Sequence, residues 1–266
     1  MNRSPIGIFD SGIGGLTVAR AVFEHLPRES TVYFGDTARV PYGPKSPETV
    51  RRYSLEILRW LLEQEVKAVV IACNTSTAHA LETLQAESPV PVIGVIEPGA
   101  AAAAAQADGR PIGVIGTAGT IASNAYAKAI RRLRAEARVE QKACPLFVPL
   151  VEEGWFDHPA ADLVAREYLA PLSASGVGSL VLGCTHYPLL RPLLQRVIGP
   201  EVRLIDSGEE TARVVATLLR ERNLEAPEGA AADHRFVVSD DEARFRQVGV
   251  RFIGERLGRA EVVPLG

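Results

Sequence analysis

Cysteine and methionine are scarce in this chain of 266 residues, which has three cysteines and one methionine. Three cysteines are too few, and odd in number, for a disulfide framework. We therefore expect free thiols and a location in the reducing cytoplasm. Lysine is also rare, and no lysine lies in an evident pyridoxal pocket, so Schiff-base chemistry is disfavoured.

Long apolar runs and an excess of positive charge are both missing. No apolar run approaches the roughly 20 residues of a membrane-spanning helix, and residues 1–5 lack the apolar stretch of a signal peptide. The formal net charge of −3 leaves no basic footprint for nucleic acid. We therefore expect neither a membrane nor a nucleic acid among the partners of this chain.

Common cofactor and metal motifs are absent as well. After Gly12-Ile13-Gly14, Thr17 stands where a dinucleotide fingerprint needs glycine, and there is no Gly-Lys-Ser/Thr phosphate loop. The chain has no Cys-x-x-Cys zinc pair, although Cys184 and His186 together with Cys73 offer a metal site as one alternative. We expect no cofactor.

What the sequence does contain is a regular alternation of apolar strand-like runs and helical patterns, which indicates parallel sheets covered by helices. The expected strands are 6–9, 31–34, 66–72, 92–96, 112–115, 179–183, 202–205, 235–238 and 261–265. The expected helices include 16–26, 47–64, 77–87, 207–222 and 241–252. Ser46 is the predicted N-cap of the second helix.

The pattern repeats, which predicts an α/β fold of two pseudo-symmetric domains with the active site in the cleft between them. Residues 6–12 and 112–118 each form a strand with glycine second and a hydroxyl residue at the exit. We expect Glu97-Pro98-Gly99 to interrupt the structure between the halves. The tail has no counterpart, so the predicted domains are 1–97 with 207–266, and 98–206.

Two of the three cysteines stand at matching places in these halves. Cys73 and Cys184 each end an apolar strand and precede a helix, where Thr75 or Ser76 can cap one helix and Pro188 suits the first turn of the other. Ligands bind beyond the carboxyl ends of such strands. Helix N-termini lower a thiol pKa and attract carboxylates. The matched pair therefore predicts two reactive thiols at one site.

Other polar residues at the strand exits complete the set. Asp10 could orient an ammonium group or a thiol, and His186 could relay protons. Spacing alone favours a solvated loop for Glu152, and the apolar neighbours of Cys144 favour the core. Further candidates are turn and exit residues at the same edge, namely Ser11, Tyr42, Gly43, Asn74, Thr75 and Thr185.

Taken together, the motifs resemble those of the glutamate racemases, the cofactor-independent members of the aspartate/glutamate racemase family. The resemblance covers nearly the whole chain. It rests on residues 8–16, 35–36, 40–43, 73–75, 94–98, 116–120, 144–146, 152–154, 183–188 and 206–208.

The resemblance implies interconversion of L- and D-glutamate without a cofactor, a supply of D-glutamate for peptidoglycan, and a homodimer. It implies that Cys73 acts on the α-proton of the D-enantiomer and Cys184 on that of the L-enantiomer. It also implies that Asp10, Glu152 and His186 assist the thiols. The implied substrate-binding residues are Asp10, Ser11, Tyr42, Gly43, Asn74, Thr75, Thr185 and His186.

Three alternatives stay open at this point. A racemase for aspartate is one, although Cys184-Thr185-His186 favours glutamate because aspartate racemases tend to carry Glu at the position of His186. A non-catalytic amino-acid-binding protein on a racemase scaffold is another. The third is a cysteine hydrolase, which would need only one thiol and His186.

Overall fold

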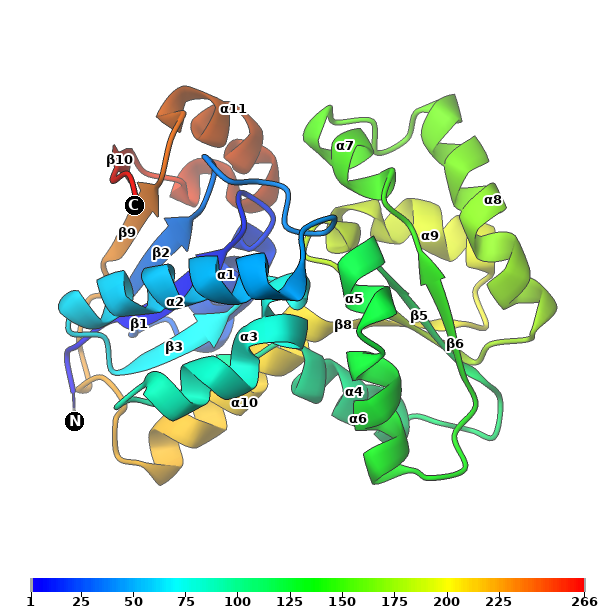
Figure 1. Cartoon of the computed structure of the whole chain (residues 1–266), viewed down its shortest axis with the longest axis horizontal. Helices are drawn as coiled ribbons and strands as arrows, with labels where there is room; N and C mark the ends of the chain where they lie inside the picture. Colours follow the sequence, from blue (N-terminus) through cyan, green and yellow to red (C-terminus); the bar gives the residue numbers. More distant parts are fainter. Residues whose placement is uncertain (1, 266) are drawn as a thin grey trace.

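The computed structural model describes residues 2–265 and contains two wholly parallel sheets (Figure 1). The first sheet has six strands in the order β10-β9-β2-β1-β3-β4. Its strands are β1 (Ile6–Asp10), β2 (Thr31–Gly35), β3 (Ala68–Ile71), β4 (Val92–Gly94), β9 (His234–Val238) and β10 (Ala260–Val262). The tail strands β9 and β10 therefore lie in the first sheet.

The second sheet has four strands in the order β6-β5-β7-β8. Its strands are β5 (Ile112–Gly116), β6 (Val139–Ala143), β7 (Ser179–Gly183) and β8 (Arg203–Asp206). Within the first sheet, β2-β1-β3-β4 has the same order, so each strand of the second sheet has a counterpart there. The predicted α/β class with two related sheets is confirmed.

Helices cover both sheets. They are α1 (Leu16–His25), α2 (Pro47–Glu63), α3 (Asn74–Glu87), α4 (Ile96–Ala105), α5 (Ala118–Ala122), α6 (Ala125–Leu133), α7 (Phe147–Glu152), α8 (Pro159–Ala174), α9 (Arg191–Ile198), α10 (Ser207–Glu221) and α11 (Glu242–Ile253), with 3-10 turns η1 (Tyr187–Leu190) and η2 (Gly254–Arg256). Within residues 2–265, no helix combines the length and the apolar character needed to cross a membrane.

The packing follows from the sequence pattern. Ile57 and Leu61 of α2 are fully buried in one cluster with Val69 of β3, on one face of the six-stranded sheet. Burying such a side chain contributes about 1.5–3 kcal/mol. The predicted cap of α2 is confirmed, because the Ser46 hydroxyl accepts from the backbone N–H of Thr49 at 3.3 Å.

Two local expectations are wrong. Helix α3 begins at Asn74, and its N-cap is Cys73 rather than Thr75 or Ser76, because the cysteine has the extended backbone that a cap requires. Glu97, Pro98 and Gly99 do not break the chain but lie in the first turn of α4. Proline is tolerated there because the N–H groups of a first turn have no partner inside the helix.

The two sheets form two lobes, with α4 and α10 packed together between them (Figure 1). We propose that the lobes correspond to the domains 1–97 with 207–266, and 98–206. The strand pairing supports this division, since β9 and β10 join the first sheet although they follow the second in sequence. The terminal residues 1 and 266 lie outside the described part of the chain.

Candidate active site

A cavity of about 460 Å³ opens where the carboxyl ends of the two sheets meet. Cys73, which follows β3, and Cys184, which follows β7, both line it, and each is about 5% exposed. Parallel strands bring their exits to one edge of a sheet, which is where open α/β folds bind ligands. The two thiols that lie 111 positions apart in sequence thus share one cavity (184 − 73 = 111).

Most of the other predicted site residues line the same cavity. They are Ser11, Tyr42, Gly43, Asn74, Thr75, Glu152, Thr185 and His186. Asp10 is absent from the lining and lies behind it, fully buried at the end of β1. The geometry brings the predicted set together, while the roles of the individual residues stay predictions.

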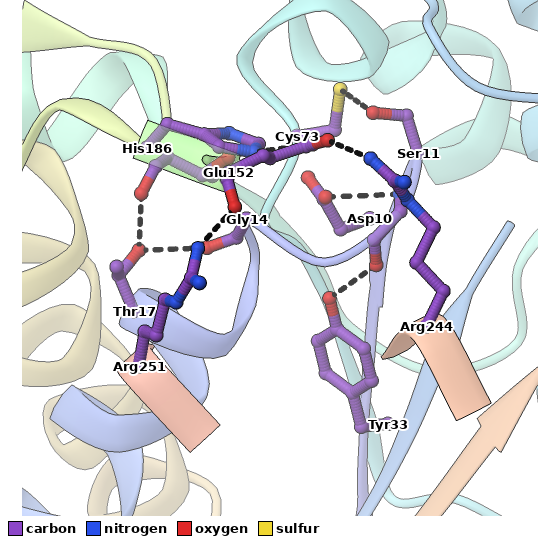
Figure 2. A network of polar contacts seen from close by, with 12 residues as sticks. Asp10, Ser11, Gly14, Thr17, Tyr33, Cys73, Glu152, His186, Arg244 and Arg251 are labelled. Atoms are coloured by element: carbon purple, nitrogen blue, oxygen red, sulfur yellow. Dashed lines mark hydrogen bonds and ion pairs between the residues drawn. The ribbon is translucent and has the colours of Figure 1, made fainter. Parts of the chain in front are cut away.

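Cys73 is fixed by two polar contacts. As the cap of α3, its sulfur accepts from the backbone N–H of Ser76 at 3.4 Å, and its thiol points to the Ser11 hydroxyl at 3.7 Å (Figure 2). The Ser76 contact favours a thiolate. Burial and the nearby charge of Asp10 act the other way and raise the thiol pKa.

Cys184 lies in an equally dry environment. Burial raises the pKa of its thiol, although the backbone amide of His186 and the Thr185 hydroxyl oppose this rise. The expectation that the helix ends would lower both thiol pKa values is therefore wrong, because burial outweighs the N–H groups. The third thiol, Cys144, is fully buried in the core, as predicted, and burial raises its pKa to about 12.

The segment around Cys184 depends on a close approach by the start of α1. A Cβ atom on Gly14 would lie 2.3 Å from the Thr185 hydroxyl and 2.4 Å from His186 Nδ1, so only glycine fits. Beside it, the Thr17 hydroxyl donates to the backbone oxygen of Thr185 at 2.8 Å (Figure 2). The glycine-rich turn thus positions residues of the opposite lobe.

Asp10 is a buried carboxylate with one free oxygen. Its Oδ2 accepts from the backbone N–H of Gly12 at 3.1 Å, and its Oδ1 makes no hydrogen bond within the described residues. Burial raises the pKa of this carboxyl, while the charge of His186 and the amides of Gly15, Gly12 and Ser11 lower it. The environment suits a group that changes its protonation or pairs with a cationic ligand.

His186 and Glu152 form a pair at the side of the cavity near Cys184. Glu152 Oε1 lies 3.1 Å from His186 Nε2, and Arg244 lies 3.3 Å from Glu152 Oε2. Burial raises the Glu152 pKa, but the bond to His186 and the charge of Arg244 outweigh burial and lower it overall. The solvated loop expected for Glu152 from spacing is therefore wrong, since α7 turns it toward the cavity.

Hydroxyl groups bridge the two lobes around the cavity. The Thr75 hydroxyl lies 2.9 Å from that of Thr117, which lies 2.9 Å from that of Thr120. Within the first lobe the Tyr42 hydroxyl donates to Asp36, and across the lobes the backbone oxygen of Gly43 accepts from the backbone N–H of Gly119 at 3.0 Å. These contacts hold the carboxyl ends of both sheets around the one cavity.

Sequence reasoning missed part of the site. Thr117 lines the cavity, and it carried a signal, because it matches Ser11 in the internal repeat. No sequence signal pointed to Arg244, because α11 is far from Glu152 in sequence. The apolar wall was missed as well, and it consists of Val40, Pro41, Pro44, Ala118, Pro145, Val148 and Pro149.

The metal alternative finds no support in the geometry. Among residues 2–265, no group of three or more His, Cys, Asp or Glu side chains is arranged to hold a metal ion. Cys73, Cys184 and His186 line one cavity but do not form such a group.

Comparison with known proteins agrees with this site. The family model "Asp/Glu/Hydantoin racemase" matches residues 14–215. A glutamate racemase of Geobacter metallireducens is 57% identical over 260 residues, which cover 98% of this chain and 96% of that protein.

Solved structures agree as well. A glutamate racemase isoform of Bacillus anthracis has a TM-score of 0.94 at 39% identity, covering 100% of this chain and 98% of that one. The glutamate racemase of Francisella tularensis, solved with D-glutamate, has a TM-score of 0.92 at 38% identity, covering 99% and 98%. The chain therefore belongs to the Asp/Glu/hydantoin racemase family and, within it, to the glutamate racemases.

Proposed function

We propose that this enzyme interconverts L- and D-glutamate by a two-base mechanism without a cofactor. One observation carries the proposal: Cys73 and Cys184, contributed by different sheets, line a single cavity. A racemase must remove a proton from one face of the α-carbon and supply one to the other face. Two opposed thiols can do both. The relative solved with D-glutamate supports glutamate as the substrate.

The reaction needs unequal protonation of the two sulfurs. A thiolate at Cys73 takes the α-proton of D-glutamate, and the Cys184 thiol gives its proton to the opposite face. The reverse direction starts from a thiolate at Cys184. Because burial raises both thiol pKa values, the bound substrate must help to stabilise the thiolate. The substrate ammonium, once desolvated beside the sulfur, favours the charged form.

The α-carboxylate and the developing negative charge need fixed partners. No Lys or Arg lines the cavity within the described residues, so N–H and O–H groups must serve instead. The start of α3, at Asn74 and Thr75, offers free backbone N–H groups and a partial positive charge. Such preorganised donors stabilise a carbanion-like transition state in a dry site.

The remaining charged groups surround the two sulfurs. The charge of Asp10 raises the pKa of both Cys73 and Cys184, whereas His186 and its partner Glu152 lie beside Cys184. In the proposed mechanism these groups assist proton transfer to and from the nearer thiol. The substrate is held by Asn74 and Thr75 together with Ser11, Tyr42, Gly43 and Thr185.

The test is racemisation of single enantiomers of glutamate with no added cofactor. We expect loss of optical rotation with glutamate and little with aspartate. In D₂O, the product should carry deuterium at the α-carbon while recovered starting enantiomer carries little. Protium fully retained in the product would contradict solvent-exchanging thiols.

Cysteine variants test the assignment of the bases. Cys73→Ala and Cys184→Ala should each abolish racemisation and leave the fold intact. Cys144→Ala is the matched control, because this thiol is buried in the core and does not line the cavity, so the variant should keep its activity. A mild effect of Cys73→Ser would instead favour a one-thiol hydrolase.

We further propose that the D-glutamate supplies peptidoglycan synthesis in the cytoplasm and that the enzyme acts as a homodimer. The bacterial relatives support the first part. Expression in a bacterium that requires added D-glutamate should restore growth, whereas the Cys73→Ala variant should not. Sedimentation analysis of the purified protein tests the dimer.

A further inference from the structure

Helix α11 reaches the Glu152 and His186 pair from the opposite lobe. Its N-cap, Asp241, accepts from the backbone N–H of Arg244 at 2.9 Å, which fixes the position of that arginine in the first turn. The Arg244 guanidinium lies 3.3 Å from Glu152 Oε2. The carboxylate therefore has His186 on one oxygen and Arg244 on the other (Figure 2).

The far end of α11 makes two more contacts with the same region. The Arg251 guanidinium donates to the backbone oxygen of Glu152. It can approach because Gly154, at φ +78°, has no Cβ, which would lie 3.0 Å from the Arg251 guanidinium carbon. The Phe252 ring meets the His186 ring edge to face, with centroids 5.6 Å apart.

These contacts join the two lobes. Helix α11 packs against α1 and β10, which belong with the six-stranded sheet, whereas α7 and His186 belong with the four-stranded sheet. In Figure 1, α11 and α7 face one another at the top of the two lobes. In Figure 2, Glu152 lies between the two arginines.

We propose that Arg244 and Arg251 are positioning residues that clamp Glu152 across the lobes and so set the geometry of the Glu152 and His186 pair beside Cys184. The inference rests on the proposed function and deepens it. Because the arginines belong to one lobe and Glu152 to the other, both contacts require the two lobes to lie together around the cavity. Opening the lobes removes both contacts together.

The charges around Glu152 determine the direction in which its pKa should move when one of them is removed. His186 faces it from the exit of β7, Arg244 and Arg251 face it from α11, and Glu153 is its chain neighbour. Asp10 faces His186 from β1. Removing the charge of Arg244 takes away one of the groups that lower the Glu152 pKa, so this pKa should rise.

The central variants are Arg244→Gln, which removes the charge, and Arg244→Lys, which keeps it. Arg246→Gln is the matched control, because Arg246 is exposed on the same helix and, within residues 2–265, forms no hydrogen bond or ion pair with Glu152. Arg251→Gln tests the second contact. Circular dichroism of each variant establishes that the fold is retained.

The first readout does not need activity. Carbon-13 labelling of glutamate side chains, with Glu152→Gln to assign the signal, gives the pH titration of the Glu152 carboxyl. We expect Arg244→Gln to move this titration to higher pH, with Arg244→Lys and Arg246→Gln close to wild type. An unchanged titration in Arg244→Gln would overturn the proposal even if the wild type racemises glutamate.

The second readout is the pH dependence of kcat/KM for glutamate racemisation. We expect Arg244→Gln to lower kcat/KM by about threefold to fivefold, as suits an exposed ion pair, and to move the acidic limb to higher pH. Arg244→Lys should restore the profile, and Arg251→Gln should raise KM more than it lowers kcat. A uniform loss without a moved limb would indicate packing alone. A wild type inactive on glutamate, with the carboxyl titration moved as expected, would refute the proposed function and leave the clamp standing.

Discussion

The Tyr126 hydroxyl donates a hydrogen bond of 2.7 Å to Asn74 Oδ1, from α6 of one lobe to the start of α3 in the other. The same hydroxyl lies 2.7 Å from the Ser207 hydroxyl at the start of α10. Both partners are buried. This bond fixes the side-chain amide of Asn74, with its oxygen held by tyrosine and its NH₂ group left for the cavity.

Removing this hydroxyl should therefore affect substrate binding. We expect Tyr126→Phe to lower kcat/KM by about fivefold, because a buried hydrogen bond is worth about 1 kcal/mol and its loss frees the amide to rotate. Steady-state kinetics with each enantiomer measures the effect. Tyr168→Phe is the control, since within the described residues the one hydrogen bond of that hydroxyl is from the backbone N–H of Leu146, at 3.4 Å. Equal losses in both variants would argue against the role of Asn74.

The thiol of Cys73 should react slowly when no substrate is added. Burial and the charge of Asp10 raise its pKa above the usual 9.0, so little thiolate exists at neutral pH. We expect the rate of alkylation by iodoacetamide to keep rising with pH beyond about pH 9. Mass spectrometry of the peptide that contains Cys73 follows the reaction, with fully buried Cys144 as the unreactive reference. A rate that levels off below pH 8 would contradict the raised pKa.

Asp10 should lower the stability of the fold that holds it. Its pKa is raised in the folded state, so the folded protein binds the proton more tightly than the unfolded chain. Stability is therefore lost as pH rises from the ordinary value of 3.8 through the raised folded value.

Asp10→Asn removes this loss, because the amide carries no charge. We expect the variant to be inactive but more stable at neutral pH by about 1 kcal/mol, or about 2–4 °C in Tm, with the difference vanishing at low pH. Thermal unfolding across the pH range measures this. A variant less stable than wild type at neutral pH would show that the carboxylate has a favourable partner.

Removing one partner of a buried ion pair far from the cavity should strongly destabilise the fold. Lys67 Nζ lies 2.5 Å from Glu29 Oε2, and both side chains are almost completely buried. Lys67 also donates to the backbone oxygens of Asn2 and Leu224, and Glu29 accepts from Ala226. The pair thus ties the N-terminal segment to the connection after α10.

Lys67→Met should cost about 3–5 kcal/mol, because Glu29 is left charged and buried. The double variant with Glu29→Leu should recover much of that loss. Denaturant unfolding measures both. Arg110→Met, which breaks the exposed pair with Asp108, should change stability little. Equal costs for the single and double variants would mean that the charges are not coupled.

The features that could be predicted from the sequence are those that depend on neighbouring residues or that recur in the two halves of the chain. Alternating patterns predicted nine of the strand positions, and Ser46 was recognisable as a cap because it precedes proline and an acidic first turn. The edge strand β6 escaped notice, because Val139–Ala143 is largely polar and only half-buried. A strand with a single neighbour need not show an apolar pattern.

The same distinction holds for the candidate site, where some features were predictable from the sequence and others depend on tertiary packing. The matched cysteines were predictable from the two strand exits, but the raised thiol pKa values were not, because they depend on how completely the lobes exclude water. Cys73 as its own helix cap was hidden by better capping residues next to it. The Arg244 contact with Glu152 depends on tertiary packing alone.

The strands β2-β1-β3-β4 of the first sheet and β6-β5-β7-β8 of the second follow the same order within their halves of the chain. Duplication and fusion of one ancestral four-stranded unit would produce this match. Two copies related by a twofold rotation present the same group to a ligand from opposite directions. An ancestral pair of identical subunits would thus have had a sulfur on each face of a bound stereocentre before the copies diverged. On that view, later divergence of the two copies made the surroundings of the two sulfurs unequal.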